Sequence, residues 1–117
     1  MVSADKWVYG LAVDPEKDKL YITDYGSKKI VVTSLDGSGE RTLLNCTDLP
    51  RGLVVDRIKR LLFYSTYQYI IYKANLDGTD VTPIVSTSLT EIYGIDIDFS
   101  TDSVCWADYC KYHLINL

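Results

Sequence analysis

The sequence predicts an all-β fold assembled from a repeated unit, because one residue pattern returns three times within 117 residues. Each copy opens with a glycine and an apolar run that ends in Asp, and the copies lie 42 residues apart. The openings are Gly10-Leu11-Ala12-Val13-Asp14, Gly52-Leu53-Val54-Val55-Asp56 and Gly94-Ile95-Asp96-Ile97-Asp98. Seven residues after each Asp comes a tetrad: Tyr21-Ile22-Thr23-Asp24, Phe63-Tyr64-Ser65-Thr66 and Cys105-Trp106-Ala107-Asp108. A fixed period of about 40 residues indicates supersecondary units that stack on their neighbours.

Each unit is expected to contain four short strands. The first strands are nearly continuous apolar runs, which is typical of strands covered on both faces. They are predicted at residues 7–14, 51–56 and 92–98, and the second strands at 19–24, 60–66 and 103–108. Third strands are predicted at 29–35, 69–76 and 111–117, and fourth strands at 41–44 and 81–85. No stretch of the chain shows helical periodicity.

Turn residues separate these strands. Asp14, Asp56 and Asp98 each follow a first strand and are interpreted as turn formers, since Asp favours turns. Asp-Gly at residues 36–37 and 77–78 supplies the positive φ of a tight hairpin between the third and fourth strands.

Four-stranded antiparallel units at this period are typical of a β-propeller. The sequence therefore predicts a partial β-propeller of about two and three-quarter four-stranded antiparallel blades. One domain covers residues 1–117, with repeats at about 7–46, 47–87 and 88–117. A leucine-rich solenoid needs shorter repeats, and a β-sandwich does not repeat its residues three times in register.

Composition excludes several function classes. The formal net charge of −4 argues against nucleic-acid binding, which needs a clustered basic face. No apolar run reaches the ~18 residues of a membrane span. Residues 1–6 lack the apolar stretch of a signal peptide, so an export signal is expected to lie outside this chain.

The tetrads resemble the Tyr-Trp-Thr-Asp signature of low-density lipoprotein (LDL) receptor class B repeats, set in the frame usual for that family. The frame reads Leu49-Pro50-Arg51-Gly52-Leu53-Val54-Val55-Asp56 before the second tetrad and Ile71-Tyr72-Lys73-Ala74-Asn75-Leu76-Asp77-Gly78 after it. The resemblance, which includes LDL-receptor-related proteins, implies a six-bladed propeller of roughly 250 residues. About half of that propeller is present. It also implies an extracellular or cell-surface setting, a protein ligand or neighbouring EGF-like modules as partners, and no cofactor.

The tetrads depart from that signature, and we interpret them as structural. Alternation along a strand places their first residues, Tyr21, Phe63 and Cys105, on one face. Their second residues lie on the opposite face, and both sets are expected to pack between blades. Asp24 and Asp108 are expected to accept hydrogen bonds from turn N–H groups, and Thr66 to do so more weakly.

Signals for an enzyme are weak. The chain has one histidine, His113, which excludes a paired-histidine zinc site. Gly37-Ser38-Gly39 lacks the lysine of a phosphate-binding loop. We therefore predict no catalytic, cofactor-binding or metal-binding residues.

Four residues are candidates for a binding surface. Asp96 replaces the Ala12 and Val54 of the other copies, on a first strand expected to line the central channel. An acid there can bind a cation or a basic side chain of a partner, or be hydrated by ordered water. A tyrosine follows every tetrad, at Tyr25, Tyr67 and Tyr109, and tyrosines on loops of one face suit a protein-binding surface. The alternative is that they close over the hairpin ends.

Three cysteines cannot all pair within one chain. Cys105 and Cys110 are a candidate disulfide across one hairpin, although a two-residue turn would place them diagonally at ~7–8 Å. Cys46 ends a fourth strand and is either buried or bonded elsewhere. Asn45-Cys46-Thr47 is a formal N-glycosylation sequon that makes Asn45 a candidate glycosylation site.

The sequence thus predicts a non-enzymatic extracellular protein-binding module, part of an LDL-receptor-like ectodomain. Two alternatives stay open: a six-bladed metal-dependent hydrolase of the lactonase kind, and a purely structural spacer. The chain is interpreted as a fragment, a truncated gene product or a half-propeller that pairs with a second copy through its open terminal blades.

Overall fold

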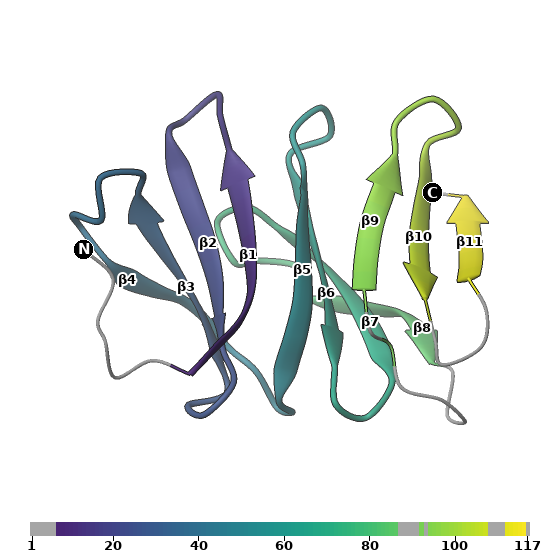
Figure 1. Ribbon diagram of the computed structural model, residues 1–117, viewed down its shortest axis with the longest axis horizontal. Helices are drawn as coiled ribbons and strands as arrows, with labels where there is room; N and C mark the ends of the chain where they lie inside the picture. The colour runs from purple at the N-terminus through teal and green to yellow at the C-terminus, as the bar shows by residue number, and fades with distance from the viewer. Residues whose placement is uncertain (1–6, 87–91, 93, 108–111, 117) are drawn as a thin grey trace.

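The protein is described by a computed structural model that covers residues 7–86, 92, 94–107 and 112–116. These residues form three antiparallel sheets and no helix (Figure 1). Blade 1 contains β1 (Val8–Asp14), β2 (Lys19–Asp24), β3 (Lys29–Ser34) and β4 (Arg41–Asn45). Blade 2 contains β5 (Pro50–Asp56), β6 (Leu61–Thr66), β7 (Ile70–Asn75) and β8 (Thr82–Ser86). Blade 3 contains β9 (Gly94–Asp98), β10 (Ser103–Ala107) and β11 (Tyr112–Asn116). The predicted partial β-propeller is confirmed, and each strand lies within two residues of its predicted range.

The first strand of each blade lies innermost. In every sheet the strands follow chain order, and β5 contacts both β1 and β9, so these three strands stand side by side (Figure 1). The loops after β1, β5 and β9 lie at the upper end of this view, and those after β2 and β6 at the lower end. Each blade therefore presents loops at two opposite ends, and its flat faces turn toward neighbouring blades.

The upper loops close on the aspartates that the sequence identifies as turn formers. Oδ1 of Asp14 accepts a hydrogen bond from a backbone N–H two residues ahead at 3.2 Å. The equivalent bonds to Asp56 and Asp98 are both 3.0 Å. Each turn also contains one residue in the left-handed backbone conformation. These residues are Asp18, Arg60 and Asp102, which lie 42 residues apart and have φ of 53°, 59° and 55°.

The Asp-Gly pairs form the predicted tight hairpin turns, because the amides of Gly37 and Gly78 donate to the carbonyls of Ser34 and Asn75 at 2.8 and 2.9 Å. Gly37 and Gly78 have φ of 86° and 88°, which only glycine adopts without strain. Residues 35–40 and 76–81 separate the strands, however, so each connection is six residues long. Within these connections the carboxylates of Asp36 and Asp77 accept backbone hydrogen bonds two residues ahead, at 2.9 and 3.0 Å.

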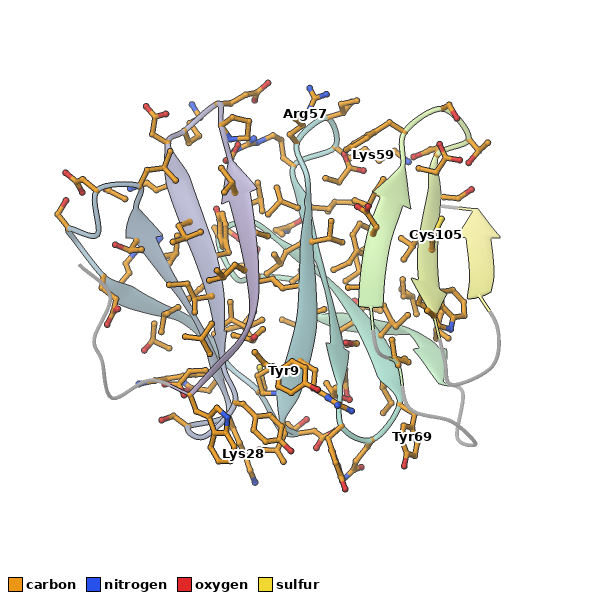
Figure 2. The ribbon with its side chains drawn as sticks, in the orientation of Figure 1. Tyr9, Lys28, Arg57, Lys59, Tyr69 and Cys105 are labelled. Atoms are coloured by element: carbon orange, nitrogen blue, oxygen red, sulfur yellow. The ribbon has the colours of Figure 1, made fainter. Side chains whose placement is uncertain are left out.

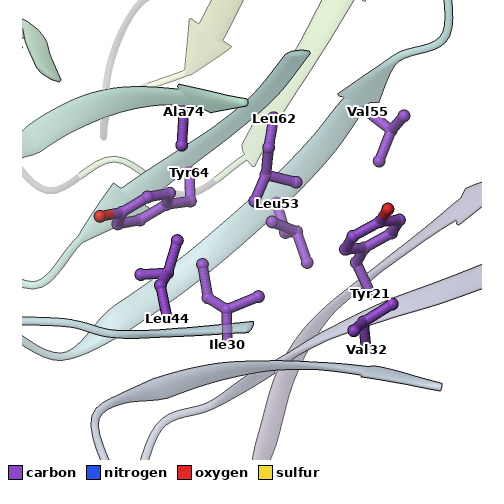
Figure 3. Close-up of a cluster of buried hydrophobic side chains, with 9 residues drawn as sticks. All are labelled: Tyr21, Ile30, Val32, Leu44, Leu53, Val55, Leu62, Tyr64 and Ala74. Atoms are coloured by element: carbon purple, nitrogen blue, oxygen red, sulfur yellow. The ribbon is translucent and has the colours of Figure 1, made fainter. Parts of the chain in front are cut away.

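Two apolar clusters hold the blades together. The cluster between blades 1 and 2 comprises Tyr21, Ile30, Val32, Leu44, Leu53, Val55, Leu62, Tyr64 and Ala74 (Figure 3). The cluster between blades 2 and 3 comprises Phe63, Ile71, Ile92, Ile97, Val104 and Trp106. Phe63 and Tyr64 are adjacent in β6 and belong to different clusters, because successive side chains of a strand point to opposite faces.

Polar groups link the same blades. The buried hydroxyl of Thr23 donates to the Arg51 carbonyl of blade 2 at 2.9 Å and accepts from the Gly10 amide of blade 1 at 2.6 Å. Gly10 lies where the β1–β2 register shifts, so its amide is displaced from the regular ladder. Arg60 of blade 2 forms an ion pair with the buried Asp14 of blade 1 at 2.6 Å.

Candidate protein-binding surface

Five side chains form a continuous row at the lower end of blades 1 and 2. They are Trp7, Tyr25, Tyr9, Arg51 and Tyr67, and we name this row the aromatic ladder. Figure 2 labels Tyr9 at this end of the molecule, far from Arg57 and Lys59 at the opposite end. The ladder crosses the boundary between two blades, so it is a property of the stacked fold and not of one repeat.

Consecutive members of the ladder touch through ring–ring or guanidinium–ring contacts. The centroids of Trp7 and Tyr25 are 5.4 Å apart with the rings edge to face, and those of Tyr25 and Tyr9 are 5.6 Å apart. The Arg51 guanidinium carbon lies 4.7 Å from the Tyr9 ring centroid and 5.8 Å from that of Tyr67. Arg51 also donates a hydrogen bond to the Tyr9 hydroxyl. Cation–π and aromatic contacts of this kind contribute ~0.5–1.5 kcal/mol each and hold the rings in place.

The repeat places these residues. Tyr9 and Arg51 are 42 residues apart and occupy the same position on the neighbouring innermost strands β1 and β5. Tyr25 and Tyr67 follow the two tetrads, and their backbone amides bond to the carbonyls of residues 7 and 49, both at 2.9 Å. Each loop is thereby tied to the strand beside it, which gives the ladder a rigid base.

The ladder is both exposed and anchored. Trp7, Tyr9 and Tyr67 are 65%, 46% and 45% exposed, whereas Arg51 is only 7% exposed. Large aromatic side chains that remain accessible while their bases are held are typical of protein-interaction surfaces, where Trp, Tyr and Arg are enriched.

Sequence reasoning placed Tyr25 and Tyr67 on a candidate surface, and the structure brings both into the ladder. Tyr109 lies outside the described residues. The other three members, Trp7, Tyr9 and Arg51, were not predicted from the sequence. The sequence did contain a clue to two of them, since Tyr9 and Arg51 directly precede the repeated glycines and so occupy equivalent positions in neighbouring repeats.

The channel-facing orientation expected for Asp96 is wrong. Its equivalents Ala12 and Val54 pack against the two inter-blade clusters, and Asp96 pairs across the sheet with Cys105. Asp96 is exposed and lies on the flat outer face of blade 3, because cross-strand partners project to the same side. It lies on a different blade from the ladder, and its Oδ1 accepts a hydrogen bond from the Ile97 amide at 2.8 Å.

The tetrad side chains are mostly inaccessible. Buried members are Tyr21, Ile22, Thr23, Asp24, Phe63, Tyr64, Ser65, Thr66 and Trp106, while Cys105 and Ala107 are half-buried. Asp24 accepts the predicted turn hydrogen bond, from the Ser27 amide at 3.3 Å. Thr66 was expected to be a weaker acceptor, but in the structure its hydroxyl donates a hydrogen bond to the Ile70 carbonyl at 3.5 Å. Asp108 lies outside the described residues.

The cysteines carry free thiols where the structure describes them, at Cys46 and Cys105. Cys110, the other half of the candidate disulfide, lies outside the described residues. The two-residue turn considered for this hairpin is wrong, since Ala107 pairs with Tyr112 and four residues separate the strands. Burial raises the pKa of the Cys46 thiol to about 12, so this thiol stays protonated and unreactive at neutral pH.

Asn45, the candidate glycosylation site, is the exposed last residue of β4. Thr47 of the same sequon is exposed as well. Both side chains are therefore accessible where blade 1 connects to blade 2.

Two further features bear on function. Within the described ranges, no three His, Cys, Asp or Glu side chains are grouped so that they would hold a metal ion. The same part of the chain includes no helix with the length and apolar character needed to cross a membrane.

Comparison with known sequences finds distant relatives. No protein-family model matches the chain. It is 31% identical over 113 residues to Protein cueball of Drosophila erecta and 31% identical over 106 residues to Protein cueball of Drosophila grimshawi. These matches include 89% and 85% of this chain but only 17% of each relative, so the chain spans less than a fifth of their length.

Solved structures share the fold. A propeller in a crystal structure of a nidogen/laminin complex superposes with a TM-score of 0.88 at 24% identity, over 93% of this chain and 44% of that one. A gluconolactonase from Xanthomonas campestris superposes with a TM-score of 0.75 at 21% identity, over 92% of this chain and 36% of that one. The resemblance seen in the repeats is confirmed at the level of architecture: the chain has an LDL-receptor class B propeller-like fold.

Proposed function

We propose that the chain is a non-enzymatic protein-binding module and that the aromatic ladder is its binding surface. The single observation that carries this proposal is the row formed by Tyr9, Arg51 and Tyr67. It joins two blades, has a buried cation at its centre and leaves large aromatic surface accessible on both sides. Covering the rings with a partner would lower the free energy of the complex. Little conformational entropy would be lost on binding, because the rings are already fixed.

A structurally similar propeller supports the same function. The nidogen propeller is found in a complex with laminin, and the gluconolactonase propeller superposes less closely. We propose an extracellular or cell-surface parent protein of the LDL-receptor-like kind, with protein ligands or EGF-like modules as partners. Asn45 is proposed to carry an N-linked glycan in that setting, since it is exposed in a formal sequon.

Binding is tested with matched variants at the two ends of the molecule. Trp7→Ser and Tyr67→Ser remove exposed aromatic surface from the ladder, while Ile58→Ser removes a side chain that is 66% exposed in an upper loop. Wild type and each variant are immobilised and exposed to an extracellular protein extract of the source organism, and the retained proteins are quantified by mass spectrometry. We expect one or a few proteins to be retained by wild type and by Ile58→Ser and lost at least tenfold from the ladder variants.

The alternatives give different results in the same experiments. A structural spacer retains no protein that depends on Trp7 or Tyr67. A hydrolase of the lactonase kind hydrolyses gluconolactone above the buffer rate when a divalent cation is added and stops when a chelator is added. Either result contradicts the proposed function.

A further inference from the structure

The end of the molecule that carries the aromatic ladder differs in charge from the chain as a whole. The loops after β2 and β6 lie at this end, and backbone hydrogen bonds tie the connection between β4 and β5 to both of them (Figure 1). The charged residues in the described part of this end are Lys28, Lys29, Arg51, Asp24 and Asp48. Cations therefore outnumber carboxylates there, although the whole chain has 16 acids and 12 bases.

Both carboxylates at this end are bound to backbone amides. Oδ1 of Asp48 accepts a hydrogen bond from the Leu49 amide at 2.7 Å, and its Oδ2 accepts one from the Gln68 amide at 2.8 Å. Asp24 is 4% exposed and accepts a hydrogen bond from the Ser27 amide at 3.3 Å. Asp48 is half-buried. The two acids thus hold the loops in shape, and neither is an exposed anion that a partner would meet first.

Lys28, by contrast, is an exposed cation beside the ladder (Figure 2). It ends the loop that begins with Tyr25, and a Cβ atom on Gly26 of this loop would lie 3.6 Å from Cβ of Trp7. The carbonyl of Lys28 accepts a hydrogen bond from the Cys46 amide at 2.8 Å, so the backbone that carries this side chain is held in place. Among the described residues, no carboxylate forms an ion pair with Lys28.

The hydroxyl of Tyr9 supplies a second donor within the ladder. Its oxygen accepts a hydrogen bond from the guanidinium of Arg51, and the Tyr9 side chain remains substantially exposed. A hydroxyl that accepts from a cation still has its own O–H to donate, and the cation strengthens that donor. The described part of the chain provides no acceptor for it. The ladder therefore combines exposed rings with two donors suited to a carboxylate, the Lys28 ammonium and the Tyr9 hydroxyl.

We propose that the ladder recognises an acidic protein segment, which places apolar groups on the rings of Trp7 and Tyr67 and carboxylates against Lys28 and Tyr9. This inference rests on the proposed function, because it names the chemistry of the partner at the same surface. A basic segment would be repelled by Lys28 and Arg51. The distribution of charge favours the same partner, since a protein of net charge −4 attracts an acidic segment chiefly at an end where cations predominate.

A phage library of random short peptides is the probe for this chemistry. Peptides are selected on wild type and depleted on Trp7→Ser, so that those which remain depend on the ladder. We expect the remaining peptides to be enriched in Asp and Glu, and depleted in Lys and Arg, relative to the unselected library. The most enriched peptide is then synthesised with a fluorophore, and its affinity for wild type and charge variants is measured by fluorescence anisotropy.

Three charge variants locate the effect. Lys28→Glu replaces attraction by repulsion and should weaken binding of this peptide about three- to tenfold at low salt, and less at high salt, where exposed charges are screened. Lys28→Arg keeps the charge and should bind like wild type. Lys17→Glu makes the same change in net charge at an exposed position in an upper loop, and it should have little effect. Circular dichroism establishes that each variant retains the β-sheet spectrum of wild type.

The outcomes separate this inference from the proposed function. Ladder-dependent peptides that are not enriched in acid, or that bind Lys28→Glu as tightly as wild type, overturn the acidic partner and leave the ladder as a binding surface. An equal effect of Lys17→Glu and Lys28→Glu also overturns it, because net charge alone would then explain the result. If no selected peptide depends on Trp7, the aromatic ladder itself is contradicted together with this inference.

Discussion

The guanidinium of Arg60 donates two hydrogen bonds to the carboxylate of Asp14 in the neighbouring blade, at 2.9 and 2.6 Å. Asp14 is fully buried, whereas the side chain of Arg60 is 35% exposed. Asp14 also closes the upper turn of blade 1, so one carboxylate both shapes a loop and joins two blades. At the next boundary the charges run the other way: Asp102 of blade 3, at the position equivalent to Arg60, forms an ion pair with Lys59 of blade 2.

Arg60→Gln is expected to lower the melting temperature by several degrees, because it leaves the buried Asp14 carboxylate without its cation. Lys59→Gln is the matched control, since both members of the Lys59–Asp102 pair are substantially exposed and such pairs contribute little. Thermal unfolding followed by circular dichroism compares the two. An equal effect of both substitutions would contradict a special role for the buried pair.

The same ion pair predicts a dependence on pH. The hydrogen bonds from Arg60 hold the pKa of Asp14 below its usual value of about 3.9. A lowered pKa in the folded state adds stability that is complete above that usual value and disappears as pH falls through the lower one. The difference in melting temperature between wild type and Arg60→Gln should therefore be constant near neutral pH and shrink below about pH 4. A difference that stays unchanged in acid would show that Asp14 is not its source.

The third tetrad residue is predicted to stabilise the blade boundary through its hydroxyl. Thr23→Val keeps the shape but leaves the Gly10 amide and the Arg51 carbonyl without this buried partner. The expected loss is ~1–3 kcal/mol in the free energy of unfolding by urea. Thr23→Ser keeps the hydroxyl and should recover most of the loss. If Ser and Val were equally destabilising, the methyl group and not the hydroxyl would be responsible.

The three repeated glycines should differ in their tolerance of alanine. Gly10→Ala forces a Cβ against the Arg51 carbonyl, which is backbone and cannot move aside, so a loss of ~1–3 kcal/mol is expected. Gly52→Ala meets the side chain of Ile95 and should cost less, and Gly94→Ala meets nothing within 4 Å and should be tolerated. Urea unfolding of the three variants checks this order. A reversed order would contradict the stacking geometry.

Much of the fold was predictable because its causes are local. A constant spacing reveals repeated units, and alternation along β6 separates Phe63 from Tyr64 onto different inter-blade clusters. The turn aspartates were predictable for the same reason, since their carboxylates bond to amides two residues ahead. The Asp-Gly turns were predictable as well, because each depends on a positive φ that glycine supplies at Gly37 and Gly78.

The ladder was only partly predictable, because it depends on how two blades stand beside each other. Tyr9 and Arg51 are 42 residues apart and meet only after their strands stack side by side. The predicted orientation of the Asp96 side chain was wrong for a related reason. The side chains of this strand were expected to point at the channel, whereas they project toward the flat faces of the blade. Contacts between repeats depend on how the separate blades stack, which the residues of one repeat do not specify.

Site-specific photo-crosslinking tests the proposed binding surface most directly. Benzoylphenylalanine replaces Tyr67 in the ladder or Ile58 at the opposite end, and each protein is irradiated in an extracellular extract of the source organism. We predict a discrete crosslinked protein from position 67 but not from position 58. An excess of unlabelled wild type should abolish this product, whereas an excess of Trp7→Ser should not. No such product, or the same product from both positions, would contradict the aromatic ladder as the binding surface.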